Sequence, residues 1–322
     1  MTPALLADPI AEARRIIELA ESDGVVLRAL GGVAVCLQAP DGAPRLPRRV
    51  KDIDLAAAKG SGRPAVKVML RAGYVADEMF NALRGSRRLL FQDPANGRHV
   101  DVFIGEFSMC HDIPMAARLN REPVTVPREE LLLSKLQIFE LTANDQADIY
   151  NLLFHNDVSD DPGGISASFI AALCAGDWGL WRTCQLNLER GLSSLGESAL
   201  EPAERDVVAG RLERLRARID AEPKSMKWRI RDRVGGRQAF ISFDIDVVDP
   251  AFAPGTGTPE AGGLSSYQAL ELIRGLHGID FIGYDVVEVI PSYDPGGVTA
   301  TLAANLAFEM MSLSAVRRRE RP

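Results

Sequence analysis

Histidine and cysteine are scarce in this sequence, and the few that occur are scattered. The 322 residues include four of each. No Cys-x-x-Cys or Cys/His spacing occurs among the cysteines, which excludes a structural zinc site and a disulfide framework and favours reduced, mostly buried thiols. No apolar run approaches the roughly 20 residues of a membrane span, and the first residues lack the pattern of a signal peptide. We therefore expect a cytoplasmic protein with no membrane partner.

Positive charge is also in short supply. The net charge of −7 argues against generic nucleic-acid binding. Two basic clusters nevertheless occur, one at Arg45, Arg48, Arg49 and Lys51 and one at Arg84, Arg87 and Arg88. Each cluster is either solvated surface or the basic rim of a functional site, and the sequence leaves both interpretations open.

The length and a change of pattern near residue 236 predict more than one unit. The earlier part predicts strands over residues 50–57, 88–91 and 99–104, a helix over 127–141 and helices from 165 to about 233. From residue 239 the chain predicts a strand over 239–248, a helix over 265–277, a strand over 279–290 and a helix over 298–316, the order of a parallel βαβα unit. The predicted fold class is therefore α/β: an α+β sheet with a helical bundle, followed by a partial parallel βαβα unit. The predicted domains are 1–160, a helical extension over 161–235, and 236–322.

A first group of acidic residues lies in the N-terminal part. In Lys51-Asp52-Ile53-Asp54 the two aspartates are two residues apart, so a strand would place both carboxylates on one face. A further aspartate, Asp101, lies in another predicted strand. Three such carboxylates on neighbouring strands can hold two Mg²⁺ ions about 4 Å apart, the arrangement used in phosphoryl transfer. The sequence thus predicts metal ligands at Asp52, Asp54 and Asp101.

Two further features predict phosphate binding beside this acidic group. Gly31-Gly32 opens a predicted helix, where backbone N–H groups can approach phosphate oxygens closely. Lys135 is alone on an apolar helix, where it either neutralises a triphosphate or simply extends its charge to the surface. Gly31, Gly32 and Lys135 are therefore the candidate nucleotide-binding residues.

Gly31-Gly32, Asp52-Ile53-Asp54 and Asp101, in this order, resemble the three-part signature of the DNA polymerase β-like nucleotidyltransferases. The downstream Leu132-Leu133-Ser134-Lys135-Leu136 and Asp145-Gln146-Ala147-Asp148-Ile149-Tyr150 resemble its bacterial branch that includes type IV toxin-antitoxin toxins. The resemblance covers residues 1 to about 235. The interval from Gly32 to Asp52 is longer than the usual family spacing, with residues 38–46 as an apparent insertion.

This resemblance implies a Mg²⁺-dependent enzyme that moves a nucleoside monophosphate from an NTP to a hydroxyl of an RNA, a protein or a small molecule. It implies that Asp52 and Asp54 bind both metal ions. Asp101 would bind the catalytic ion and assist deprotonation of the acceptor hydroxyl. An antitoxin is an expected partner.

A second acidic group lies in the C-terminal part. Ser242-Phe243-Asp244-Ile245-Asp246-Val247-Val248-Asp249-Pro250, the glycine-rich residues 253–264, and Asp285-Val286-Val287-Glu288-Val289 closely resemble the C-terminal part of the agmatinase and arginase (ureohydrolase) family. The resemblance implies that Asp244 and Asp246 are ligands of a dinuclear Mn²⁺ site and that Glu288 holds the substrate guanidinium. Such a site would release urea from a guanidino compound.

The other metal ligands of that family come from a Gly-Gly-Asp-His segment and an Asp-Ala-His-x-Asp segment, and neither occurs in this sequence. Two aspartates alone would supply a minority of the ligands and no imidazole. A two-stranded parallel sheet also needs a packing surface, which suggests homo-oligomerisation through the C-terminal segment or docking on the first part. We therefore favour a nucleotidyltransferase fused to a ureohydrolase fragment. An agmatinase-like amidinohydrolase and a non-catalytic fusion or interaction protein are the alternatives.

Overall fold

The computed structural model describes residues 5–225, 228–229, 232, 238–277 and 279–319. The chain divides into two compact units, Met1–Lys224 and Ser225–Pro322, which we call unit 1 and unit 2. The predicted helical extension packs within unit 1 as far as Ala221. The predicted boundary near residue 236 falls in 233–237, outside the described residues, so the predicted division into domains stays a prediction. In the described part of the chain, no helix is both long and apolar enough to cross a membrane.

Unit 1 contains a mixed sheet of five strands in the order β1-β2-β5-β4-β3. The strands are β1 Leu27–Leu30, β2 Ile53–Ala57, β3 Val75–Ala76, β4 Arg88–Gln92 and β5 His99–Ile104. Strands β2 and β5 are parallel, and the other neighbours are antiparallel. A short hairpin, β6 Glu106–Ser108 and β7 Asp112–Pro114, follows β5. Of the three central strands, β4 and β5 are consecutive in the chain, whereas β2 comes earlier and is separated from them by β3.

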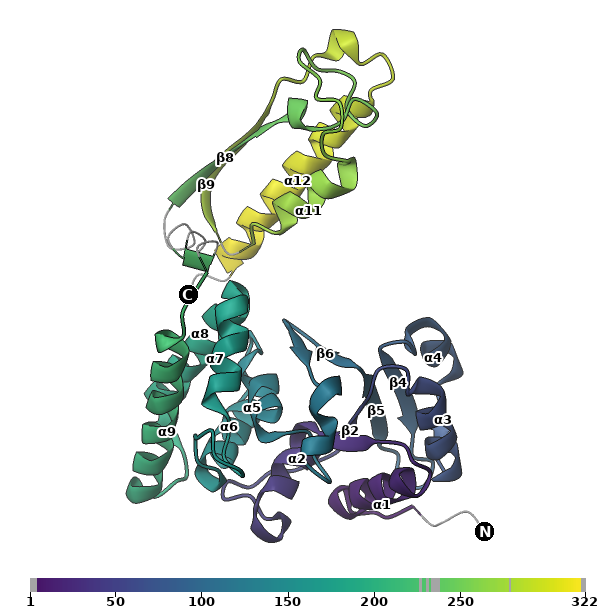
Figure 1. Ribbon diagram of the computed structural model, residues 1–322, viewed down its shortest axis with the longest axis vertical. Coiled ribbons are helices and arrows are strands. Elements are labelled where there is room, and N and C mark those ends of the chain that lie inside the picture. The colour runs from purple at the N-terminus through teal and green to yellow at the C-terminus, as the bar shows by residue number, and fades with distance from the viewer. Residues whose placement is uncertain (1–4, 226–227, 230–231, 233–237, 278, 320–322) are drawn as a thin grey trace. The chain divides into compact units, whose positions relative to one another are not determined.

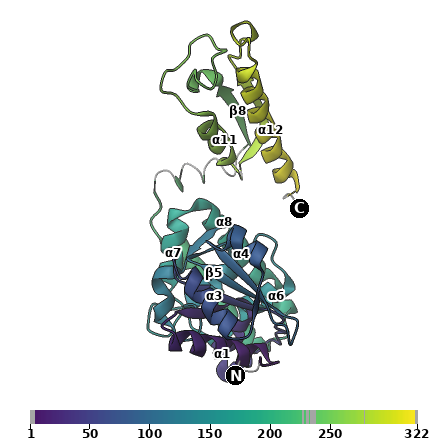
Figure 2. The same ribbon diagram turned by 90° about the vertical axis from the view of Figure 1, so that its right-hand side faces the viewer.

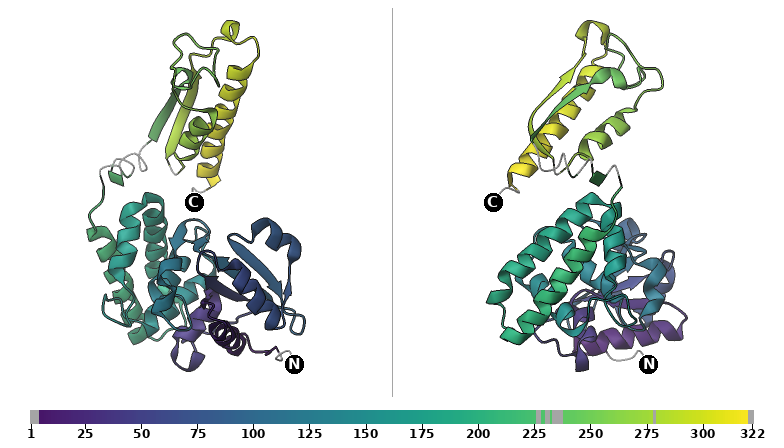
Figure 3. Two further views of the ribbon diagram at one scale, coloured as in Figure 1. Left: turned by 45° about the vertical axis from the view of Figure 1, so that its right-hand side comes forward. Right: turned by 60° about the vertical axis from the view of Figure 1, so that its left-hand side comes forward.

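Helices α5 to α9 form a bundle beside this sheet, and α1, α3 and α4 lie at the sheet end of the unit (Figures 1 and 3). The helices are α1 Pro9–Ser22, α2 Gly31–Gln38, α3 Gly62–Arg71, α4 Glu78–Arg84, α5 Arg128–Leu136, α6 Ala143–His155, α7 Ala167–Gly176, α8 Trp178–Ser194 and α9 Pro202–Ala221. Several begin at polar side chains that accept backbone N–H groups. Asp8 caps α1 at 2.8 Å from the amide of Ala11, and Thr142 and Asp145 form a capping box on α6. One apolar core, from Ala13 to Ile219, joins sheet and bundle.

Two elements are shorter than the sequence pattern predicts, one at its end and one at its start. The predicted helix over 127–141 ends at Leu136, because the Asn187 side chain of α8 donates to the carbonyls of Leu136 and Ile138 at 2.9 and 2.7 Å. The predicted strand over 50–57 begins only at Ile53. Its pairing with β5 also begins there. Asp52 therefore precedes the strand.

The long segment before β2 is fastened to α6. The Asn151 side chain accepts from the amide of Leu46 at 2.7 Å and donates to its carbonyl at 3.0 Å. The guanidinium of Arg48 donates to Asp148 at 2.8 Å. Both partners are buried, at 1% and 0% exposure. The apparent insertion in the sequence is thus an ordered part of unit 1.

Unit 2 is a βαβα unit, as the sequence predicts. It consists of β8 Gln238–Asp244, α11 Ser266–Arg274, β9 Asp280–Val287 and α12 Val298–Arg319 (Figure 2). The two strands are parallel. Ile241 and Phe243 pack with the two helices in a core of their own, whereas Phe240 and Ile282 are 60% and 64% exposed. The helices therefore supply the packing surface that a two-stranded sheet needs, and they do so on one face only.

Candidate active site

Two carboxylates of the first acidic group lie directly side by side in unit 1. Asp54 of β2 is paired with Asp101 of β5 in the parallel register. Residues opposite each other on neighbouring strands point to the same face of the sheet. Asp101 is 8% exposed. Two acidic side chains thus share one partly buried position on the sheet.

The third predicted ligand, Asp52, is exposed and precedes the strand. Its Oδ1 accepts from the backbone amide of His99 at 3.2 Å, which satisfies an amide at the first residue of β5. Among the residues that the structure describes, no group of three or more His, Cys, Asp and Glu side chains is arranged to hold a metal ion. The site with three carboxylates and two ions stays a prediction.

The environment of Asp54 fits a cation. Burial raises the pKa of Asp54 to about 6, and the neighbouring charge of Asp101 acts in the same direction, against the opposing effects of Lys135 and Arg88. Oxygen ligands of this kind are those that Mg²⁺ prefers, and a divalent cation between two such carboxylates would relieve their repulsion. The chemistry of the pair therefore suits one divalent ion.

The glycine pair determines how close Asp54 comes to the start of α2. Gly31 has φ +64°, and a Cβ built there would lie 2.2 Å from Asp54 Oδ2. A Cβ on Gly32 would lie 2.9 Å from Nη2 of Arg48. Both positions thus need glycine for close approach. In this structure it is a carboxylate and a guanidinium that approach, and phosphate binding by these glycines stays a prediction.

Lys135 does not simply reach the surface from α5. Its Nζ lies 2.9 Å from Asp145 and 2.9 Å from Asp148, and the residue is 8% exposed. Burial alone would lower the pKa of Lys135, but Asp148 and Asp145 outweigh it and the net shift is upward. Asp148 also forms an ion pair with Arg48, so one buried carboxylate is paired with both Lys135 and Arg48.

Arg88 of β4 contacts the acidic pair, although the sequence did not distinguish its cluster from solvated surface. Its Nε donates to Asp101 Oδ1 at 2.7 Å. The guanidinium carbon lies 5.8 Å from the ring centroid of Phe80 and 5.2 Å from that of Phe103. The signal that could have identified it is its place in a strand next to the one that carries Asp101.

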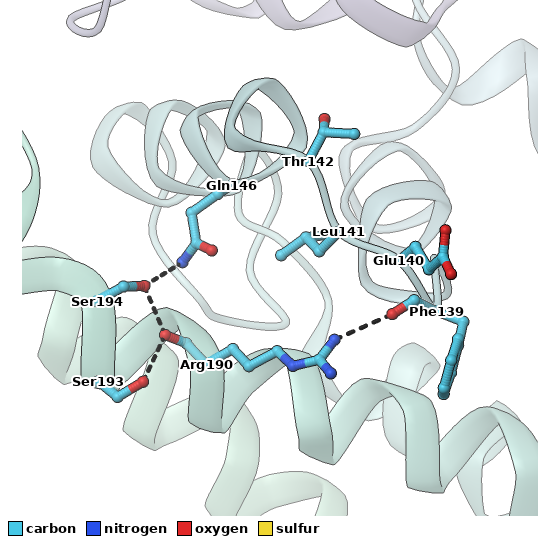
Figure 4. A pocket seen from close by; sticks show the side chains of 8 residues that line it. All are labelled: Phe139, Glu140, Leu141, Thr142, Gln146, Arg190, Ser193 and Ser194. Atoms are coloured by element: carbon cyan, nitrogen blue, oxygen red, sulfur yellow. Dashed lines mark hydrogen bonds between the residues drawn. The ribbon is translucent and has the colours of Figure 1, made fainter. Parts of the chain in front are cut away.

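A separate pocket of about 590 Å³ lies between the α5–α6 connection and α8 (Figure 4). Its lining residues are Phe139, Glu140, Leu141, Thr142, Gln146, Arg190, Ser193 and Ser194. Arg190 donates to the carbonyl of Phe139 at 3.0 Å, and Gln146 donates to Ser194 at 2.8 Å. The pocket contains none of the predicted site residues, and these polar side chains fasten α8 to the neighbouring helix connection.

The second acidic group lies at the ends of the strands of unit 2. Asp244 ends β8 and accepts from the amide of Asp246 at 3.0 Å, while Asp246 accepts from the hydroxyl of Thr258. Glu288 directly follows β9 and has φ +62°, a left-handed conformation that is strained for a non-glycine residue. Asp244 and Asp246 thus accept hydrogen bonds from residues of the segment that follows β8.

The comparisons with known proteins concern mainly the C-terminal region. The Arginase family model matches residues 201–312. A guanidinobutyrase of Pseudomonas aeruginosa is 58% identical over 82 residues, which are 26% of this chain and 26% of that protein. A mitochondrial guanidino acid hydrolase of Homo sapiens is 60% identical over 82 residues, which are 26% of this chain and 23% of that protein. The chain thus spans about a quarter of the length of these curated relatives.

Among solved structures, the proclavaminate amidino hydrolase from Streptomyces clavuligerus is 51% identical, with 27% of this chain and 29% of that chain covered and a TM-score of 0.26. The family model, and not this structural match, shows that residues 201–312 are similar in sequence to the Arginase family. The family match begins at residue 201 and does not include Asp54, Asp101 or the glycine pair.

Proposed function

We propose that unit 1 is a divalent-metal-dependent nucleotidyltransferase that transfers a nucleoside monophosphate from an NTP to a hydroxyl of an RNA, a protein or a small molecule. The observation that carries this proposal is the direct pairing of Asp54 with Asp101 on parallel strands. The glycine turn beside Asp54 supports it, because α2 begins at Gly31, directly against Asp54, and a helix N-terminus has backbone N–H groups without helical partners.

The residues of this chain would divide the reaction as follows. Asp54 and Asp101 would hold Mg²⁺, with Asp52 at the exposed edge of the site. When bound, Mg²⁺ neutralises phosphate charge and polarises the phosphoryl group. Asp101 would accept the proton of the acceptor hydroxyl while the hydroxyl oxygen forms a bond to the α-phosphorus. The bond from that phosphorus to the bridging oxygen breaks, and pyrophosphate leaves.

Gly31 and Gly32 would let phosphate oxygens approach the backbone amides of α2. Lys135 would contribute positive charge from behind the site, where its pairing with Asp145 and Asp148 keeps it protonated. An antitoxin that covers this site and self-association through unit 2 belong to the same proposal.

Labelled nucleotides test this function. The protein is incubated with each NTP, labelled either at the α- or at the γ-phosphate, and with total cell RNA and protein. We expect transfer of the α-label only, with a loss of at least about 100-fold in Asp54→Asn. Asp206→Asn, an exposed change in α9, is the matched control and should keep full activity. Equal labelling by Asp54→Asn and the control would exclude Asp54 from the chemistry.

The comparisons favour a second function, an agmatinase-like amidinohydrolase activity of unit 2. The similarity to a guanidinobutyrase of Pseudomonas aeruginosa, with 58% identity over 82 residues, supports it. Asp244 and Asp246 would bind Mn²⁺, and Glu288 would pair with a guanidinium through two parallel hydrogen bonds. Against this activity stands the composition of the described part of unit 2, in which no metal-ligand cluster of three or more residues occurs.

The two functions are separated by urea release and its dependence on Asp246, because the metal site proposed for unit 1 would also bind Mn²⁺. The full chain is purified with added Mn²⁺, and urea is measured with agmatine and with 4-guanidinobutyrate as substrates. We expect no urea above background. Stoichiometric manganese together with urea release that disappears in Asp246→Asn would place the amidinohydrolase first.

A further inference from the structure

Arg88 is in direct contact with the acidic pair of unit 1. Strand β4 lies next to β5, with Arg88 opposite Phe103 and Leu90 opposite Asp101. Since Asp54 is opposite Asp101 on the other side, three neighbouring strands place Asp54, Asp101 and Arg88 on one face of the sheet. The guanidinium therefore approaches the carboxylates along the face on which a metal ion would bind.

The contact uses an oxygen that a metal ion would also need. Nε of Arg88 lies 2.7 Å from Oδ1 of Asp101, whose side chain is 12% exposed. The hydrogen bond to Asp101 raises the pKa of Arg88, and the charge of Asp54 adds to the rise. One cation thus partly neutralises both carboxylates.

The exposure of the Arg88 side chain leaves room for its guanidinium to leave Asp101. The side chain is 46% exposed, so a change of rotamer meets solvent. Phe80 and Phe103 flank the guanidinium and can keep it near the site after it leaves the carboxylate. Lys135, by contrast, is held between two buried or half-buried aspartates.

We infer that Arg88 is a built-in counter-cation of the acidic pair, which a divalent metal ion must displace from Asp101 in order to bind. Arg88 is thus a positioning residue that tunes metal affinity. The inference rests on the proposed function only in taking Asp54 and Asp101 as metal ligands. It concerns binding of the metal alone, before any nucleotide or acceptor.

The test is a titration of the metal-free full chain with Mn²⁺, followed by isothermal calorimetry and by the electron paramagnetic resonance signal of free Mn²⁺. Arg88→Gln removes the competing charge, and Arg88→Lys keeps it. Arg87→Gln is the matched control, because Arg87 is the exposed neighbour and its loss changes the net charge equally. Circular dichroism verifies that each variant is folded.

We expect Arg88→Gln to bind Mn²⁺ about two- to fivefold more tightly than Arg87→Gln, the change that removal of one partly exposed ion pair implies. Arg88→Lys should lie between Arg88→Gln and the wild type. In an Asp101→Asn background, the difference between Arg88→Gln and Arg87→Gln should disappear.

Equal or weaker Mn²⁺ binding by Arg88→Gln relative to Arg87→Gln would overturn the inference, as would no Mn²⁺ binding by any variant. Tighter binding without any nucleotidyl transfer would contradict the proposed function and leave the inference standing. Nucleotidyl transfer together with equal Mn²⁺ affinity of Arg88→Gln and Arg87→Gln would support the proposed function and contradict the inference about Arg88.

Discussion

The charge of Asp54 should destabilise unit 1 when no metal is bound, and Asp54→Asn should remove this cost. The two side chains are nearly isosteric, so the substitution chiefly removes the charge. Burial and Asp101 raise the pKa of Asp54 from its ordinary 3.8 to about 6. Each pKa unit corresponds to about 1.4 kcal/mol between the two protonation states, so the shift corresponds to about 3 kcal/mol of unfolding free energy.

The sign of this effect gives it a pH dependence. Because the pKa of Asp54 is higher in the folded state than in the unfolded state, the folded protein binds the proton more strongly. The contribution of Asp54 to the free energy of unfolding should therefore fall as pH rises from about 3.8 to about 6, and this loss should be complete above pH 6. The advantage of Asp54→Asn should be absent near pH 4 and reach about 3 kcal/mol at pH 8.

Urea denaturation of the full chain in EDTA measures this difference. Trp178 and Trp181 lie in α8 of unit 1, and a Trp228→Phe background removes the one tryptophan of unit 2, so the fluorescence follows unit 1. Asp52→Asn is the matched control, because Asp52 is exposed and its amide oxygen can still accept from His99, and its stability should change by less than about 0.5 kcal/mol. A gain for Asp54→Asn that is the same at pH 4 and pH 8, or a loss at pH 8, would refute the electrostatic reasoning.

Three further predictions concern unit 1. Gly97→Ala should cost about 1–2 kcal/mol because of its φ of +67°, and Gly31→Ala should cost about 1–3 kcal/mol more because its Cβ would also collide with Asp54; equal costs in thermal unfolding would contradict this close approach. Burial raises the pKa of Glu130 from 4.5 to about 6. Glu130→Gln should therefore stabilise the protein by about 2 kcal/mol above pH 6 and by nothing below pH 4.5. Urea denaturation at pH 4.5 and 8 measures this difference, and a gain that does not depend on pH would be evidence against it. A fragment of residues 1–224 should unfold in one cooperative transition, because its core ends at Ile219; a fragment without a calorimetric transition would show that unit 1 needs the rest of the chain.

The sequence predicts the secondary structure of the site better than its contacts. Alternation of Asp52 and Asp54 predicts a shared face, but Asp52 precedes β2 because pairing with β5 begins at Ile53. The turn between β4 and β5 is local and places Arg88 near Asp101, whereas the pairing of β2 with β5, which brings Asp54 beside them, is contained in no local pattern. The apolar spacing around Lys135 predicts a helix, yet its ion partners come from the next helix.

The secondary structure of unit 2 is easier to predict from the sequence. Two continuous apolar runs separated by a helical pattern predict parallel strands, and β8 and β9 are parallel. Their ends differ from the prediction, because the predicted strand over 239–248 stops at Asp244, where a short 3₁₀ turn over Ile245–Val247 begins. The Asp244 side chain accepts from the amide of Asp246 in this turn, a local bond that competes with the sheet.

The attachment of the segment before β2 to α6 also affects the order in which the protein folds. The bond from Arg48 to Asp148 and those between Leu46 and Asn151 join residues that are 100 and 105 positions apart. Contacts of such separation form late, since a long loop must close first. We therefore expect the start of β2 to reach its final position only after α6 has been synthesised and has docked. On the ribosome, a chain that ends before residue 148 would contain all three predicted carboxylate ligands, but the segment that leads into β2 would still lack its anchor on α6.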